Sequence, residues 1–208
     1  MTSTDDLIAA LAEAAPTTGK RSNWRLLAPM AAVTFACIAA TTLLLGALFP
    51  VADSFETAPM LGKWIFSVPL LVLATLALFS LGIPGRQTGL VLVALVVPFA
   101  YVGALGLPSL FSDPQIFPGL AWQRCLAAMA IMSPIGFASA VISVRKLAPT
   151  NLNRAGCVAG LFGGAVAMTA YTPFCEGRGM LYFVLYYFSP IMLMAAIGWL
   201  AGPRLLRW

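Results

Sequence analysis

Six long apolar segments constrain what this chain can fold into. They cover residues 26–49, 64–83, 88–107, 122–144, 155–173 and 181–202. A helix needs about 20 apolar residues to cross the hydrocarbon core of a bilayer. The chain is 61% hydrophobic and 9% charged, whereas a soluble domain carries roughly 25% charged residues. The sequence therefore predicts an all-α integral membrane protein, with one bundle of six transmembrane helices in residues 26–208.

The basic residues between these segments predict the orientation of the bundle. If the N-terminus is cytoplasmic, only Lys63, Arg124 and Arg178 of the 12 Lys and Arg residues lie outside. Cytoplasmic loops of membrane proteins are enriched in Lys and Arg. We therefore expect a bacterial inner-membrane protein with both termini in the cytoplasm. Topology then accounts for the net charge of +5, and no nucleic acid is expected as a partner.

The N-terminal segment, residues 1–25, is polar enough to lie in water. Ser3 and Asp6 have the spacing of a helix-capping box. Leu7 and Leu11 then form part of one apolar stripe, so the segment predicts a short amphipathic helix. Two interpretations remain open: the helix lies on the membrane surface or the bundle, or it docks a soluble partner.

Several kinds of chemistry are disfavoured by the residues that are missing. His is absent, which excludes His-based acid–base catalysis and His-containing zinc sites. No charged residue lies in the middle of an apolar segment, although transporters often place ionisable groups there. We expect no enzyme active site, cofactor or resident metal. A small transporter or channel and a membrane thiol oxidoreductase are the alternatives, and the absence of a C-x-x-C motif disfavours the second.

Two of the four cysteines are candidate functional residues. Cys37 and Cys157 lie inside apolar segments and are expected to act as small packing residues. Cys125 and Cys175 flank the fourth and fifth segments. If these segments form a helical hairpin, both thiols reach the outer face at the same depth. Three interpretations remain open for this pair: a structural disulfide, a redox or soft-metal sensing pair, and unpaired packing cysteines.

The fifth segment carries a row of glycines. Gly156, Gly160 and Gly164 form two overlapping GxxxG motifs, which let a neighbouring helix approach closely. The small residues of the fourth segment make it the expected partner. Packing between two copies of the chain is the alternative.

Short motifs along nearly the whole chain carry a resemblance to a known family. They are Thr4-Asp5-Asp6-Leu7-Ile8, Arg124-Cys125, Ser133-Pro134, Ala148-Pro149-Thr150, Ala170-Tyr171, Cys175-Glu176 and Gly202-Pro203-Arg204-Leu205-Leu206-Arg207-Trp208. In this order and spacing the sequence resembles the NrsF family of six-span inner-membrane anti-sigma factors. Members of that family negatively regulate extracytoplasmic-function sigma factors.

The resemblance implies a partner and a site for it. The partner would be an extracytoplasmic-function sigma factor, released by a signal at Cys125 and Cys175. Relatives often have His before the second cysteine, where this chain has Phe174, so sensing through an imidazole is not implied. The residues expected to hold the sigma factor in the cytoplasm are Asp5, Asp6, Leu7, Ile8 and Leu11.

Overall fold

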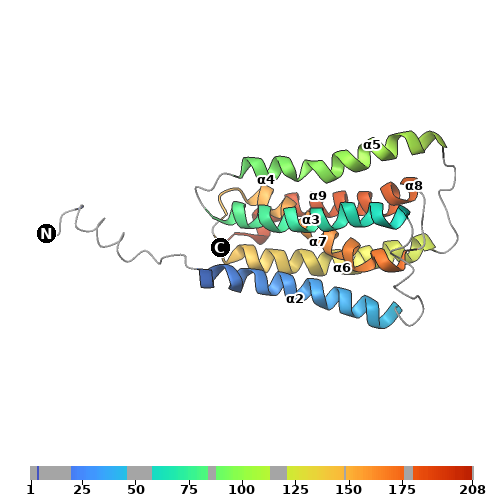
Figure 1. Cartoon of the computed structure of the whole chain (residues 1–208). Helices are drawn as coiled ribbons and strands as arrows, with labels where there is room; N and C mark the ends of the chain where they lie inside the picture. Colours follow the sequence, from blue (N-terminus) through green and yellow to red (C-terminus); the bar gives the residue numbers. More distant parts are fainter. Residues whose placement is uncertain are drawn as a thin grey trace.

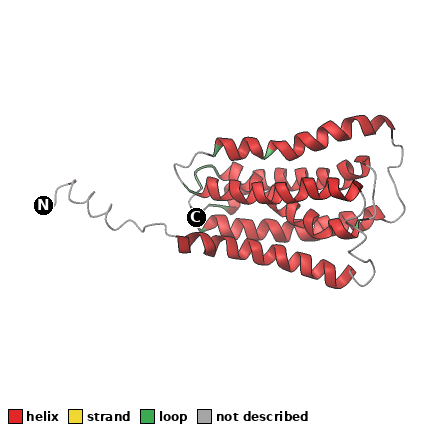
Figure 2. Cartoon of the chain, viewed as in Figure 1, coloured by secondary structure: helices red, strands yellow, loops and turns green. Residues whose placement is uncertain are grey.

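The structure, a computed structural model, is built from helices. It describes residue 4 and residues 20–45, 58–83, 88–112, 121–147, 149–175 and 180–207, and this part of the chain contains no strand (Figure 2). The longer helices are α2 (Lys20–Leu45), α3 (Ala58–Gly82), α5 (Val96–Ser112), α6 (Ala121–Arg145), α7 (Leu152–Tyr171) and α9 (Ser189–Leu205). The all-α prediction is confirmed. The expected N-terminal amphipathic helix, with Asp5, Asp6, Leu7, Ile8 and Leu11, lies outside the described residues.

Five of the six predicted spans are helices long and apolar enough to cross a membrane. The third, predicted over 88–107, is divided at Leu95 into α4 (Gly89–Ala94) and α5, and its described apolar part is shorter. The helices also present apolar side chains outward, with Leu43 80% and Leu90 83% exposed. Such a surface suits a hydrocarbon solvent better than water.

Helix α7 lies at the centre of the bundle. In its apolar stretch 94% of the residues are buried, and the helix packs against α2, α3, α6 and α9 (Figure 1). A helix surrounded on every side needs small side chains where its neighbours approach. The sequence of α7 meets this requirement with alanine and glycine along most of its length.

The glycine row of α7 packs against α9. A Cβ added at Gly156 would collide with the backbone of Gly198, and one added at Gly160 would collide with Met194. Gly164 lies against Ile191 of the same helix. The prediction that this glycine row packs against the fourth segment is therefore wrong, because its partner is α9. The last helix carries its own GxxxG pair, Gly198 and Gly202, so two bare backbone faces meet.

A different pair of glycines joins α6 to α7. Gly163 lies so close to α6 that an added Cβ would meet the Ser133 carbonyl oxygen, and Gly136 faces Gly163 in return. Because Gly163 lies next to Gly164 in the chain, α7 uses adjacent glycines for two neighbours. The two neighbours, α6 and α9, both contain apolar stretches long enough to span a membrane.

The last helical segment, residues 180–205, contains an irregular turn, and we call this segment the C-terminal rod. The short helix α8 (Met180–Phe183) runs into the π-helical turn η3 (Val184–Phe188), and α9 follows without a break. A π turn inserts an extra residue into a helix and is frequent at functional sites.

The two ends of the bundle differ in composition. One end, which we call the basic end, carries Arg145, Arg154 and Arg204, and α2 begins there (Figure 1). At this end the Arg145 Nε donates a hydrogen bond to the Leu205 carbonyl. Cys125 and Cys175 lie at the opposite end, which we call the thiol end.

We predict that Gly156→Ala destabilises the fold by about 1–3 kcal/mol, because the added methyl group overpacks the α7–α9 contact. Gly103→Ala is the matched control, since a Cβ at this helical position meets nothing within 4 Å. Heat unfolding of both variants in detergent measures the difference. Equal midpoints for the two variants would show that the close contact does not stabilise the fold.

A candidate thiol site

Cys125 and Cys175 come together at the thiol end. Cys125 lies in the second turn of α6, and Cys175 follows the short 3-10 turn η2 (Thr172–Phe174) that ends α7. Their Sγ atoms are 3.3 Å apart, and the residues are 1% and 2% exposed. The 3-10 turn positions Cys175, whose amide donates to the Thr172 carbonyl. The hairpin thus brings together two thiols that are 50 residues apart in the chain.

Two tyrosine hydroxyls reach the Cys125 sulfur. The Tyr182 hydroxyl donates to the Cys125 Sγ at 2.9 Å, and the Tyr187 hydroxyl lies 3.5 Å from the same atom. In a regular α-helix, residues five apart point about 140° away from each other. Tyr187 lies within the π turn η3, which begins two residues after Tyr182 and changes that angle. The irregular turn thus allows both hydroxyls to face one sulfur atom.

A buried lysine completes the site. Lys63 of α3 is 4% exposed, and its Nζ donates to the Cys175 carbonyl oxygen at 3.4 Å. The same Nζ lies 5.8 Å from the ring centroid of Tyr187, within the range of a cation–π interaction. From the sequence, Lys63 is expected only to mark the topology of the chain. Its position within an apolar run, next to Trp64 and Ile65, is the signal that could have identified it.

Aromatic rings pack against one another next to the thiols. The rings of Tyr182 and Tyr186 are 4.6 Å apart, and those of Phe66 and Phe183 meet edge to face at 5.4 Å. Edge-to-face and tilted pairs of this kind are favourable by about 0.5–1.5 kcal/mol beyond the area they bury. We call the two buried thiols, Lys63 and these aromatic residues the thiol chamber.

The two sulfurs lie at a separation from which a disulfide can form. A disulfide needs an S–S distance of about 2.05 Å, so the sulfurs have only a short way to move together. A metal bound linearly between two thiolates, with each bond near 2.3 Å, needs the sulfurs about 4.6 Å apart, a shift of similar size in the opposite direction. Among the described residues no group of three or more Cys, Asp or Glu side chains could hold a metal ion.

The remaining predicted residues have other roles or lie elsewhere. Cys37 is buried in α2, and Cys157 is partly buried in α7. Gly156, Gly160 and Gly164 line the α7–α9 contact and do not reach the thiols. The sigma-factor residues expected at 5–11 are outside the described part of the chain.

These features define a class of protein: an all-helical bundle with helices of membrane-spanning length and a buried thiol pair at one end. A sequence model of one family, described as "NrsF: Negative regulator of sigma F", matches residues 11–208. The chain belongs to this family.

Two curated relatives agree with the family match. The probable anti-sigma-F factor NrsF of Azospira oryzae is 32% identical over 82% of this chain and 84% of its own length. The anti-sigma-F factor NrsF of Caulobacter vibrioides is 30% identical over 99% of both chains. No solved structure matches the chain.

We predict that a mild thiol oxidant such as diamide joins Cys125 to Cys175 within one chain, because their sulfurs already lie 3.3 Å apart. Peptide mapping by mass spectrometry without reduction should show this link. A Cys37→Ser/Cys157→Ser variant is the control and should form the same link. The geometry would be contradicted if the link were absent, or if it formed only between two chains.

Proposed function

We propose that this chain is a membrane-embedded anti-sigma factor that holds an extracytoplasmic-function sigma factor and releases it when the thiol pair reacts. The match to the NrsF family over residues 11–208 carries the proposal. Both relatives, which are named as anti-sigma-F factors, support it. An anti-sigma factor of this kind regulates by binding and needs no catalytic residues.

We place the bundle in the bacterial inner membrane with the basic end in the cytoplasm. Arg145, Lys146 and Arg154 lie around the turn between α6 and α7, and α2 and α9 reach the same end. Basic residues favour the cytoplasmic side. The N-terminal segment that precedes α2 then lies on the same side as the transcription machinery, and the thiol end faces the periplasm, where disulfides persist.

The proposed signal is a change in the bond between the two thiols. Forming a disulfide shortens the 3.3 Å separation of the sulfurs and changes the acceptor of the Tyr182 hydroxyl. Tyr182 and Tyr187 belong to the rod that continues as α9. Because α9 packs backbone to backbone on α7, we propose that it carries a displacement to the basic end. Allosteric coupling of this kind requires two arrangements that differ in their affinity for the partner.

We predict that deleting residues 1–15 releases the sigma factor while the protein stays in the membrane. A finer variant, Leu7→Ser/Leu11→Ser, removes part of the apolar stripe and should weaken binding of the sigma factor at least tenfold, since each buried leucine contributes about 1.5–3 kcal/mol. Co-purification from detergent-solubilised membranes measures both effects.

The control for the stripe is Ala9→Ser, on the opposite face of the predicted helix, which should retain the sigma factor. Undiminished co-purification after the deletion would show that the sigma factor binds elsewhere on the chain.

We predict that Cys125→Ser/Cys175→Ser keeps the sigma factor bound under oxidising stress, because no disulfide can form. A reporter driven by the sigma factor should then stay near its unstressed level, while Cys37→Ser/Cys157→Ser responds as the wild type does. A normal response of the Cys125/Cys175 variant would rule out the thiol trigger and leave the binding of the sigma factor intact.

A further inference from the structure

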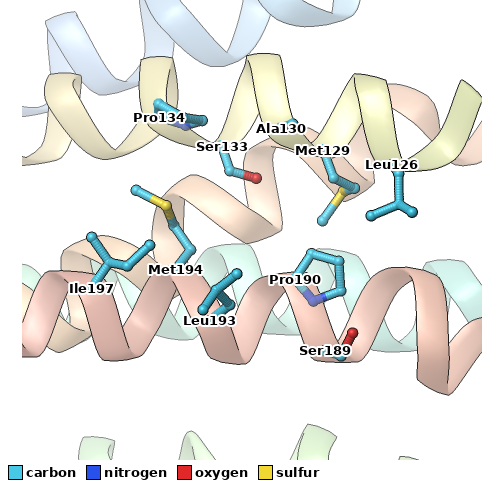
Figure 3. A pocket seen from close by; sticks show the side chains of 10 residues that line it. All are labelled: Leu126, Met129, Ala130, Ser133, Pro134, Ser189, Pro190, Leu193, Met194 and Ile197. Carbon is cyan, nitrogen blue, oxygen red and sulfur yellow. The ribbon is translucent and has the colours of Figure 1, made fainter. Parts of the chain in front are cut away.

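A pocket opens on the side of the bundle between α6 and α9. It encloses about 300 Å³, which is the lower end of the size range of small-molecule sites. Met129, Ser133 and Met194 are buried in its floor, and Leu193 and Ile197 are exposed at its edge (Figure 3). The mouth therefore lies on the apolar outer surface that the proposed membrane covers.

One polar group in this pocket has no partner. The Ser133 hydroxyl is buried, makes no hydrogen bond, and points into the pocket in Figure 3. By contrast, Ser139 and Ser143 of the same helix donate to backbone carbonyls at 2.7 and 2.9 Å. A buried hydroxyl that is left unpaired destabilises a fold, because it has lost its hydrogen bonds to water. A ligand with a hydrogen-bond acceptor would satisfy this group.

The pocket and the surroundings of Cys125 share two helical segments, α6 and the segment that contains η3 and α9. Cys125, Met129 and Ser133 recur at i, i+4 and i+8, so they lie on one face of α6. The rise from Cys125 to Ser133 is about 12 Å. On the opposite wall, Tyr187, which lies 3.5 Å from the Cys125 Sγ, is followed closely in the chain by Ser189 of the pocket lining.

The position and lining of the pocket favour a quinone over a phospholipid as its ligand. Ser133 lies at the midpoint of α6 (Ala121–Arg145), a depth that the ester carbonyls of phospholipids do not reach. An acyl chain does reach it, but an acyl chain leaves the hydroxyl unpaired. A quinone ring carries carbonyl acceptors on a flat apolar body that dissolves in the membrane. The sulfurs of Met129 and Met194 can contact the ring, since thioethers pack favourably on aromatic faces.

We propose that this pocket binds a membrane quinone and that the quinone oxidises the thiol pair; the inference rests on the proposed redox role of Cys125 and Cys175. Ser133 donates to one carbonyl, and the ring extends past Met129 toward Cys125. Two electrons and two protons pass from the thiols to the quinone. The sulfur–sulfur bond forms, and the quinone leaves as hydroquinone. The thiols are only 1% and 2% exposed, and Met129, which lies between Ser133 and Cys125 on the same face of α6, lines the pocket.

The test uses the reduced full-length protein in detergent, without oxygen, with decylubiquinone as the probe. We expect one hydroquinone for each Cys125–Cys175 disulfide, measured by absorbance and by thiol labelling. Ser133→Ala should slow the reaction about tenfold, the effect of losing one hydrogen bond to the ligand. Ala130→Leu, which fills the pocket, should slow it further.

Two matched controls separate the pocket from general effects on folding. Ser139→Ala removes a buried hydroxyl that already has a partner, and Ala127→Leu enlarges an exposed residue of α6 outside the pocket. Both should react with the quinone as the wild type does. Diamide, which needs no pocket, should oxidise all variants at similar rates.

Each outcome bears on a different claim. Equal quinone rates in Ser133→Ala, Ala130→Leu and the controls would overturn the quinone site. So would a phospholipid that stays in the pocket when the quinone is added. If diamide releases the sigma factor and the quinone does not, the proposed function stands and this inference fails. If neither oxidant releases it, the thiol trigger itself is wrong.

Discussion

The close contact between α7 and α9 is the interaction on which the rest of the structure depends. In a bilayer, the burial of apolar side chains contributes little to the association of helices. Van der Waals contact between closely fitting surfaces must hold them together instead. Gly156 and Gly160 of α7 meet Gly198 and Gly202 of α9, and the backbones touch. With α9 fixed along α7, the tyrosines of the preceding segment are held over Cys125. The thiol chamber therefore depends on glycines that lie far from it in the bundle.

The helices were predictable because hydropathy reports directly on solvent. Runs such as 122–144 have the length and apolar character that a bilayer requires, whatever their neighbours are. The break at Leu95 was not predictable, since both sides of it are equally apolar. The neighbour of Gly156 was not predictable either. Small residues lie on α6 as well as on α9, and spacing along one helix does not say which surface it meets.

The candidate site was predictable only in part, for a similar reason. Cys125 and Cys175 stood out because they flank a hairpin, and antiparallel geometry brings such positions together. Lys63 was missed because charge near the end of an apolar run usually marks topology. The structure shows instead that α3 begins at Ala58, so Lys63 lies inside the helix and faces the chamber. The π turn could not be predicted, because the aromatic residues around Tyr187 show no periodic spacing that distinguishes a π turn from an α-helix.

The thiol chamber has a consequence for the reverse reaction. Reducing a disulfide requires a thiolate to approach one sulfur in line with the bond, and the burial of both cysteines restricts that approach for a soluble reductant. A bond formed there would outlast the stress that formed it, until the bundle opens locally or the chain is replaced. The same burial that restricts access to the thiols would give the cell a record of past oxidation, with a lifetime set by the opening rate of the bundle.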